Sequence, residues 1–516
     1  MAATRKSGIL CHPTCMPGRW GIGDLGDGVY RFIDWLVDAG QTVWQILPLG
    51  PTGYGDSPYQ PFSAFAGNPL LIDLSELVRE GLLVEEDLIR DRPFAEEYVN
   101  YGDVIEFKTH VLRRAFDHLR RQANPALWQQ VEDFRHEQAY WIEDYALFMA
   151  LKLRFNWAVW TEWERSVALR EPHAVERWRD ELRNEVDYQC FLQFLFHRQW
   201  QRVRRYANDA NITLIGDVPI FMGHDSADVW SHQELFLLDE HGMPRVQAGV
   251  PPDYFSATGQ LWGNPHYDWE VMRRDGYTWW TARLRRVLSQ IDLVRIDHFR
   301  GFAGYWEVPA GEETAINGRW IKGPGSDIFH VLEHELGGLP IIAEDLGLIT
   351  PDVIALRDEL GLPGMRVLQF AFDSDAGNVH LPHNWSANCL AYTGTHDNDT
   401  TLGWYATRDP EVQHRARVYT GTDGTDMHWT LIRLLSTSVA DTAIFPLQDA
   451  LGLGSEARLN RPGNPQGNWT WRYRQEMLRP ELADALRELA ILTGRWIEPG
   501  KELQPSLAEP VEYEEM

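Results

Sequence analysis

The sequence predicts an α/β protein built as a TIM (β/α)8 barrel with large inserted, mainly helical subdomains. Short apolar runs alternate with longer amphipathic patterns, eight of these runs have strand length, and several end directly on acidic residues. Ending a buried strand on a charge is costly, so repeated carboxylates at strand ends indicate one rim of a barrel. A barrel with insertions also accommodates 516 residues as one unit.

The expected strands are short and rich in Val, Ile, Leu and Phe. They cover residues 7–12, 42–48, 213–221, 293–299, 340–344, 365–372, 389–395 and 442–447. An amphipathic pattern predicts a helix over residues 27–39, between the first two strands.

Two stretches are too long to be simple connections. Residues 50–206 exceed one crossover helix and are expected to form an inserted subdomain between strands 2 and 3, with helical spacing of its aromatic residues. Residues 222–280 are dense in Gly, Pro and Trp and predict a loop insertion over the active face. No internal repeat or low-complexity linker is evident, so residues 1–516 are interpreted as a single barrel. Little more than a helix and an acidic tail follows the last strand, which predicts no C-terminal β-sandwich domain.

Composition limits the possible partners. With 44% hydrophobic and 24% charged residues, the chain has the composition of a soluble globular protein. The formal net charge of −27 argues against nucleic acid, which would need a basic stripe. The 23 Trp residues either fill a large core or provide faces on which sugars stack.

The cysteines and the termini predict a cytoplasmic protein. The four cysteines have no zinc-binding spacing and are expected to be free thiols: Cys11, Cys15, Cys190 and Cys389. The first residues lack the apolar stretch of a signal peptide, and no run is long enough to span a bilayer, so no membrane partner is expected. A monomer is the default expectation, because no coiled-coil pattern is evident.

The strand over residues 293–299 carries the first acid of interest. Alternate residues of a strand share a face, so Arg295 and Asp297 are expected to be neighbours. A permanently charged guanidinium lowers the pKa of an adjacent carboxyl and keeps it ionised, as a nucleophile requires. The alternative is a structural ion pair at a strand end.

Glu344 ends an apolar run and has no arginine beside it in the sequence. Burial and nearby negative charge both raise the pKa of a carboxyl, which suits a proton donor. Asp345 points to the opposite face and is free to cap the following helix instead.

Asp397 follows a short strand inside the polar cluster 392–400. Acids at such positions also form turns and helix caps, an interpretation that suits Asp399 better than Asp397. Three acids at three strand ends together indicate glycosidic chemistry. Two carboxyl groups about 5 Å apart would permit a double displacement with retained anomeric configuration.

In this scheme Asp297 attacks the anomeric carbon and forms a glycosyl ester, while Glu344 protonates the leaving oxygen and later deprotonates the incoming hydroxyl. Asp397, with His298 and His396, would hold ring hydroxyls and favour an oxocarbenium-like sugar. Either histidine could instead be a structural residue at a strand end.

These residues resemble the signature of the α-amylase clan, in which an R-x-D strand, a Glu-ended strand and an H-D strand follow in order. Within that clan the chain is identified as a member of the 4-α-glucanotransferase family, also called amylomaltase, disproportionating enzyme or glycoside hydrolase family 77. The matching segments span nearly the whole chain: 57–59, 216–221, 249–256, 259–265, 299–302, 393–398, 458–460 and 467–469.

One departure from true amylases supports this assignment. The first amylase signature, D-x-x-x-N-H, would place Asn and His after Asp217 where this chain has Phe221 and Met222. Those amylase residues are tied to calcium binding and sugar contact, and the 4-α-glucanotransferase family also lacks them. The resemblance therefore implies no metal and no cofactor.

The resemblance also implies roles for individual residues. Asp297 would be the nucleophile, Glu344 the general acid/base and Asp397 the stabiliser of the transition state. The implied substrate contacts are Tyr59, Asp217, Arg295 and His396 at the cleaved sugar, and Trp262 and Asn264 on the covering loop. Tyr54 and Tyr101 would form a second glucan contact outside the cleft.

The implied reaction is transfer of an α-1,4-glucan segment to the 4-hydroxyl of another glucan or of glucose, so the expected partners are α-1,4-glucans and malto-oligosaccharides. An α-1,4-glucan hydrolase uses the same acids and remains an alternative, because only the preference for a sugar acceptor over water separates the two. A non-catalytic glucan-binding protein would have the cleft without a working acid/base pair. A debranching enzyme would need a second set of catalytic segments, which the sequence does not show.

Overall fold

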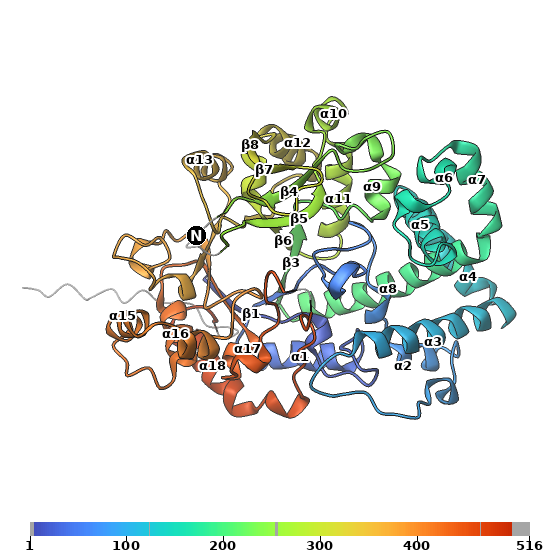
Figure 1. The fold of residues 1–516 in the computed structure, drawn as a ribbon. Coiled ribbons are helices and arrows are strands. Elements are labelled where there is room, and N and C mark those ends of the chain that lie inside the picture. Colours follow the sequence, from blue (N-terminus) through green and yellow to red (C-terminus); the bar gives the residue numbers. More distant parts are fainter. Residues whose placement is uncertain (1–4, 123, 253–255, 465, 498–516) are drawn as a thin grey trace, which may run out of the picture.

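A computed structural model describes residues 5–122, 124–252, 256–464 and 466–497 of the chain. Eight parallel strands form a nearly closed barrel in the order β10-β11-β12-β1-β2-β3-β6-β9, surrounded by helices (Figure 1). The strands are β1 Lys6–Leu10, β2 Val43–Gln45, β3 Thr213–Pro219, β6 Leu293–Asp297, β9 Ile341–Ala343, β10 Gly364–Val367, β11 Cys389–Tyr392 and β12 Thr442–Pro446. The predicted fold class is confirmed, and each strand lies inside or within one residue of its expected range.

The interior of the barrel is a packed apolar core. Side chains from seven of the eight strands meet there, and Leu293 of β6 packs against them. They are Leu10, Val43, Ile215, Ile342, Met365, Val367, Leu390, Tyr392 and Ile444. Because alternate residues of a strand share a face, the residues two positions further along these strands face the same interior, nearer the carboxyl ends.

The helix α1 Asp27–Asp38 joins β1 to β2, as the sequence predicts. The long stretch between β2 and β3 holds most of the additional helices: α2 Leu74–Arg79, α3 Tyr101–Gln122, α4 Pro125–Glu137, α5 Ile142–Arg154, α6 Arg165–Ala168, α7 Pro172–Glu181 and α8 Arg183–Asp209. The last of these, α8, packs against α5 on one side and against α1 and β3 on the other. It therefore connects these additional helices to the barrel.

The segment 222–280 is not the loop that its Gly and Pro content predicted. It contains α9 Ala227–Ser231, β4 Val246–Val250, β5 Gln260–Pro265, α10 Trp269–Arg274 and the start of α11 Thr278–Leu288. β4 and β5 join β7 Gly304–Pro309 and β8 Arg319–Lys322 in an antiparallel sheet ordered β5-β4-β7-β8, which lies beside the barrel strands β3 and β6 in Figure 1. Because the partner strand β7 comes from a later segment, no local sequence pattern predicts this pairing.

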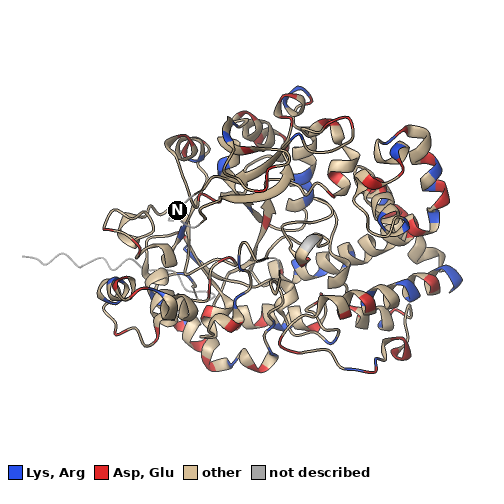
Figure 2. Ribbon diagram, viewed as in Figure 1, with Lys and Arg blue, Asp and Glu red and all other residues tan. Residues whose placement is uncertain are grey.

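The remaining helices complete the outer layer. They are α12 Asp327–Leu336, α13 Pro351–Glu359, α14 Thr401–Thr407, α15 Pro410–Thr420, α16 Met427–Thr437, α17 Leu447–Ala450 and α18 Pro480–Leu492. Basic and acidic residues are interspersed along the outer helices (Figure 2). Within the described residues, no helix is both long and apolar enough to cross a bilayer. The four cysteines are free and buried, as expected.

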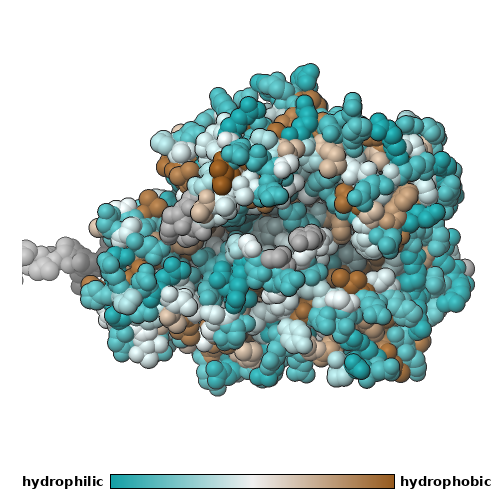
Figure 3. All heavy atoms as spheres, in the orientation of Figure 1, coloured by the Kyte–Doolittle hydropathy of each residue, from teal (hydrophilic) through white to brown (hydrophobic). Residues whose placement is uncertain are grey.

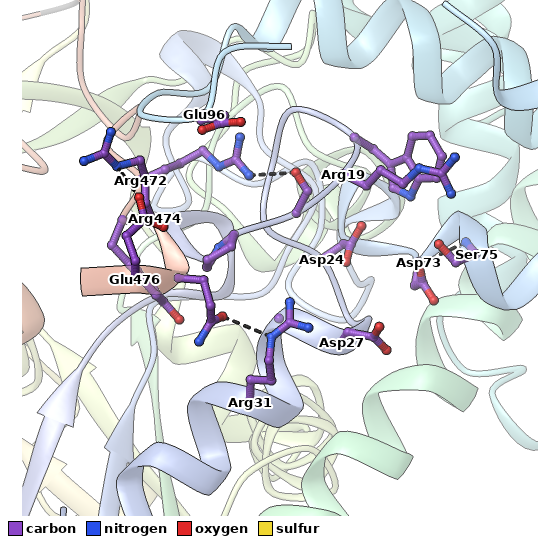
Figure 4. Close-up of a pocket in the computed structure, with 16 residues that line it drawn as sticks. Arg19, Asp24, Asp27, Arg31, Asp73, Ser75, Glu96, Arg472, Arg474 and Glu476 are labelled. Atoms are coloured by element: carbon purple, nitrogen blue, oxygen red, sulfur yellow. Dashed lines mark hydrogen bonds and ion pairs between the residues drawn. The ribbon is translucent and has the colours of Figure 1, made fainter. Parts of the chain in front are cut away.

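Residues 472–476 lie beside the segment 17–31 at a polar cavity of about 470 Å³ (Figure 4). Arg472 lies at this junction and donates hydrogen bonds to the carbonyl oxygens of Met16, Gly18 and Ala95. Arg31 on α1 donates to the side chain of Gln475 at 3.0 Å. These bonds attach the C-terminal segment to the loop that follows β1.

Candidate active site

The three predicted acids follow the carboxyl ends of three barrel strands. Asp297 is the last residue of β6, Glu344 comes directly after β9, and Asp397 lies in the turn after β11. β6 and β9 pair in parallel with Ile296 opposite Ala343, so the next positions along both strands are Asp297 and Glu344. The acids therefore share one rim, and the face of the molecule over β1, β3 and β6 is hollowed (Figure 3).

Arg295 links two carboxylates at this rim. Its guanidinium donates to Asp217 Oδ2 at 2.5 Å and to Asp297 Oδ1 at 2.8 Å. Asp217 lies opposite Arg295 in the β3–β6 ladder, and both side chains are buried. The expected proximity of Arg295 and Asp297 is confirmed, and the same guanidinium group also binds Asp217.

The net pKa shift of Asp297 differs from the expected one. Burial raises the pKa of Asp297 more than Arg295 lowers it, so the pKa lies above its ordinary value. The adjacent guanidinium alone predicts a lowered pKa, whereas the folded site also removes water from the carboxyl. Arg295 still favours ionisation of Asp297 over that of a neighbouring carboxyl without a cation.

Glu344 has no ion pair among the described residues, and the charge of Arg295 lowers its pKa less than its burial and the charge of Asp297 raise it. Burial, followed by the charge of Asp297, raises the pKa of Glu344 to about 8. Its two oxygens accept hydrogen bonds from the backbone nitrogens of His298 at 2.7 Å and Leu346 at 2.9 Å. The expected rise is confirmed, and the bond to His298 places Glu344 next to the end of β6. At neutral pH, Glu344 is therefore the protonated member of the pair.

Asp345 does not cap the following helix. It accepts from the backbone nitrogen of Met365 at 2.6 Å and pairs with Arg357 at 2.5 Å. Helix α13 instead begins after Thr350. Asp345 does point away from Glu344, as the alternation of a strand predicts.

Asp397 is held from a segment that the sequence argument did not select as part of the site. Asn460 Nδ2 donates to Asp397 Oδ1 at 2.6 Å, and Arg458 donates to the carbonyl oxygen of Asp397 at 2.7 Å. His396 Nε2 lies 3.4 Å from Asp397 Oδ1. The motif 458–460 was noted only as part of the family resemblance, and its residues here fix one of the three acids.

Tyr59 joins the early loop to the catalytic rim. Its hydroxyl donates to Asp217 Oδ2 at 2.8 Å, and its ring stacks on His396 with centroids 4.9 Å apart. Trp469 lies 5.9 Å from Tyr59 and 6.0 Å from His396. Trp469 was not selected from the sequence, although the motif that contains it marked the segment.

His12 was also missed, although it lies at the end of the first predicted strand, where a polar residue is unusual. It is buried, and its Nδ1 accepts from the backbone nitrogen of Leu47 at 3.2 Å. Burial, with a smaller effect from His396, lowers the pKa of His12 to about 3. The imidazole is therefore neutral at pH 7.

Trp262 and His298 meet beside the acids. The ring of Trp262 lies edge-to-face against His298 at 4.8 Å. His298 has a left-handed backbone with φ 57°, and its buried Nε2 has no hydrogen-bond partner among the described residues. Burial lowers its pKa to about 3, so the ring is neutral. Asn264 on β5 is buried and accepts from Gln60 Nε2 at 3.4 Å.

Tyr101, one of the two residues expected in an outer glucan contact, is largely buried, and its role there stays a prediction. Tyr101 is 7% exposed, its hydroxyl donates to the carbonyl oxygen of Trp469 at 3.0 Å, and it lines a small cavity with Asp56 and Pro58. The side chain of Tyr54 lies outside the described part of the structure.

Fold and rim together define a (β/α)8-barrel enzyme of the class that acts on glycosidic bonds, with an arginine-held aspartate beside a glutamic acid. The chain belongs to the 4-alpha-glucanotransferase family, whose profile matches residues 11–478. It is an enzyme of the 4-α-glucanotransferase type, and it resembles relatives along almost its whole length.

Two curated relatives show the extent of this similarity. The 4-alpha-glucanotransferase of Synechocystis sp. is 54% identical over 501 residues, which cover 96% of this chain and 99% of that protein. The 4-alpha-glucanotransferase of Thermus thermophilus is 49% identical over 503 residues, covering 96% and 100%. Among solved structures, the amylomaltase from Streptococcus agalactiae in complex with acarbose superposes with a TM-score of 0.93 at 38% identity, covering 96% of this chain and 100% of that one.

Proposed function

We propose that the protein transfers a segment of an α-1,4-glucan to the 4-hydroxyl of a second glucan or of glucose, through a covalent glycosyl ester on Asp297. The family supports the reaction class. The observation that supports this mechanism most directly is that the two carboxyls have different surroundings. Asp297 accepts a hydrogen bond from the Arg295 guanidinium at 2.8 Å, which favours its ionised form, whereas burial raises the pKa of Glu344 to about 8 and favours its protonated form.

In the first step the Asp297 carboxylate attacks the anomeric carbon while the proton of Glu344 passes to the glycosidic oxygen. The C–O bond to the leaving glucan breaks, and a glycosyl ester forms on Asp297. Glu344 is then ionised. The leaving glucan carries the free 4-hydroxyl and dissociates.

In the second step Glu344 takes the proton of the acceptor 4-hydroxyl, whose oxygen attacks the same anomeric carbon. The ester bond to Asp297 breaks, and Glu344 regains its proton. Each displacement inverts the anomeric carbon, so the two together retain the α configuration. No redox partner is required, because each step exchanges one C–O bond for another, and the proton that Glu344 gives in the first step returns to it in the second.

Positive charge develops on the sugar ring in the transition state of each displacement. Asp397, oriented by Asn460, and the imidazole of His396 offer hydrogen-bonding groups to the ring hydroxyls. Because the Asn460 contact fixes the Asp397 carboxylate before substrate arrives, little reorganisation is needed as charge builds up. Tyr59 holds Asp217 beside this same position.

The acceptor decides between transfer and hydrolysis. Trp262 lies against His298, beside the backbone nitrogen that contacts Glu344, so an apolar face borders the proton donor. Such a face favours a bound sugar over water at the ester. The acarbose complex of the Streptococcus agalactiae amylomaltase shows that a relative binds a saccharide-like ligand.

Pure maltotriose tests the proposal. Transfer converts it to glucose and to longer maltodextrins without changing the number of reducing ends. Hydrolysis releases glucose and maltose, and the number of reducing ends rises with time. Accumulation of reducing ends without any product longer than maltotriose would overturn the transferase assignment.

A further inference from the structure

Asp449 is a buried carboxylate that lies outside the catalytic rim. It belongs to α17, the short helix that follows β12, and it is 1% exposed. Its Oδ2 accepts hydrogen bonds from the hydroxyls of Thr393 at 2.6 Å and Thr401 at 2.7 Å, and its Oδ1 accepts from the backbone nitrogen of Thr401 at 2.6 Å. Burial raises the pKa of Asp449 more than these bonds lower it, so keeping a carboxyl at this place is costly.

The three hydrogen bonds join the two ends of one turn. Thr393 is the first residue after β11, and Thr401 is the first residue of α14. Both threonines are buried. Between them lie residues 394–400, which include His396 and Asp397. Asp449 therefore fixes the strand end and the helix start between which Asp397 reaches the rim.

The turn has little freedom between these two ends. Asn398 Oδ1 accepts from the backbone nitrogen of Thr395 at 2.9 Å, and the backbone nitrogen of Asp397 donates to Thr395 Oγ1 at 3.3 Å. Gln369, which lies just after β10, donates from Nε2 to the carbonyl oxygen of Asp399 at 2.8 Å. Because the turn is bonded internally, a displacement of its ends moves Asp397 with it.

The position of Asp397 matters for the reaction. Its side chain is 45% exposed, so it faces the open side of the site. A carboxylate that stabilises developing charge must be in place before the charge appears, and a displacement of about 1 Å costs about a hundredfold in rate. Asp449 itself is too deeply buried to contact a substrate.

We infer that Asp449 is a positioning residue for the reaction: by holding Thr393 and Thr401 together, it places Asp397 against the sugar. This inference rests on the proposed function for the role of Asp397 in the transition state. Loss of the Asp449 contacts should therefore lower kcat and leave KM for maltotriose nearly unchanged, because most groups that bind the glucan stay in place.

Two substitutions separate the hydrogen bonds of Asp449 from its charge. In Asp449→Asn, the amide oxygen still accepts from the backbone nitrogen of Thr401, and the amide nitrogen donates to the two hydroxyls, which can also accept. This variant should keep kcat within about threefold of the native value. Asp449→Ala leaves three buried donors without partners, and kcat for maltotriose should fall about a hundredfold. A native kcat in Asp449→Ala would overturn the inference.

Asp73→Ala is the matched control for a general loss of stability. Asp73 is 4% exposed and accepts from the backbone nitrogens of Ser75 and Glu76, both at 3.0 Å, so it caps α2, which carries no residue of the rim. Both alanine variants should have a lower thermal midpoint. Well below that midpoint, Asp73→Ala should have a native kcat, whereas Asp449→Ala should not. Equal losses of kcat in the two variants would contradict a positioning role.

Thr393→Val covers the case in which Asp449→Ala does not fold. Valine keeps the shape of threonine and removes one of the three donors to Asp449, so kcat should fall roughly tenfold and KM should stay within about threefold. Thr437→Val is its control, because this exposed hydroxyl donates only to carbonyl oxygens of its own helix. If the two valine variants have the same kcat, Thr393 does not act on Asp397 through Asp449.

A double substitution tests whether Asp449 acts through Asp397. In an Asp397→Asn background, the group that Asp449 places has already lost its charge. Adding Asp449→Ala should then lower kcat by less than about threefold, instead of the hundredfold expected in the native background. A second loss as large as the first would show that Asp449 acts independently of Asp397 and would refute the inference.

The same variants separate this inference from the proposed function. If maltotriose is elongated and Asp397→Asn lowers kcat, but Asp449→Ala does not, the proposed function stands and the positioning role is wrong. If maltotriose is hydrolysed instead of elongated, the proposed transfer is wrong. The rate of hydrolysis in the single and double variants then decides the positioning role by the same comparison.

Discussion

The carboxylate of Asp345 accepts a hydrogen bond from the backbone nitrogen of Met365 at 2.6 Å and so joins β9 to β10. These two strands are the ends of the eight-stranded order; they form no ladder in the described structure, but the backbone nitrogen of Ala343 also donates to the carbonyl oxygen of Pro363 at 3.0 Å. Glu344, one residue earlier, accepts instead from the end of β6. Asp345 therefore helps to link the two end strands of the barrel, whereas Glu344 faces the candidate site.

Replacing Asp345 with alanine should lower the free energy of unfolding by about 3–5 kcal/mol, because Arg357 would keep a partly buried charge without its buried partner. Urea denaturation measures the change. Asp358→Ala is the matched control, since this exposed carboxylate also contacts Arg357 but should contribute less than about 1 kcal/mol. Equal losses in the two variants would contradict a closing role for Asp345.

Strand periodicity explains why the rim could be predicted from the sequence. Arg295 and Asp297 share a face because the period of a strand is a local property, and the same argument separates Glu344 from Asp345. The β4–β7 pairing could not be foreseen, because it joins residues 246–249 to residues 306–309 across a Gly- and Pro-rich segment. Nor could the raised pKa of Asp297, which comes from burial by the whole site.

The partners of the acids were harder to predict than the acids themselves. Asn460 reaches Asp397, and His12 lies near His396, from segments far away in the sequence. The burial of Tyr101 could not be read from the sequence either. Contacts of this kind depend on tertiary packing, which no spacing rule encodes.

The pH dependence of catalysis should report Glu344. Its pKa of about 8 means that the free enzyme holds the required proton below that pH and loses it above. The value of kcat/KM for maltotriose should therefore fall as pH rises through about 8, with a tenfold loss per pH unit beyond it. Steady-state rates across the neutral and alkaline range measure this limb. Full activity well above pH 8 would exclude Glu344 as the proton donor.

Arg295→Lys should reduce kcat/KM about a hundredfold, because one ammonium group cannot bridge Asp217 and Asp297 as the guanidinium does. Arg295 lowers the pKa of Asp297, so weakening this contact should also move the acidic limb of the pH profile to higher pH. Arg300→Lys is the control, since Arg300 is buried nearby but donates to backbone oxygens. An acidic limb that stays in place would refute the link between the two residues.

Tyr59 contributes a hydroxyl and a ring, and two substitutions separate them. Tyr59→Phe removes the donor to Asp217 and should lower kcat/KM roughly tenfold, as expected for a hydrogen bond to a charged group. Tyr59→Ala also removes the ring stacked on His396 and should raise KM in addition. If phenylalanine and alanine have the same effect, the ring makes no separate contribution.

The covalent route makes a prediction that no stability effect can mimic. In Glu344→Gln, a natural glucan cannot leave because its oxygen receives no proton, and turnover should fall by about 10³-fold. A maltosyl donor with an acidic leaving group, such as a fluoride, needs no protonation, so it should still react with Asp297. The second step lacks its base, and the ester should accumulate with a burst equal to the enzyme concentration. Mass spectrometry of the peptide that contains Asp297 should then show the added maltosyl mass, whereas Asp297→Asn should show neither burst nor adduct. An adduct on any other residue would assign the nucleophile elsewhere.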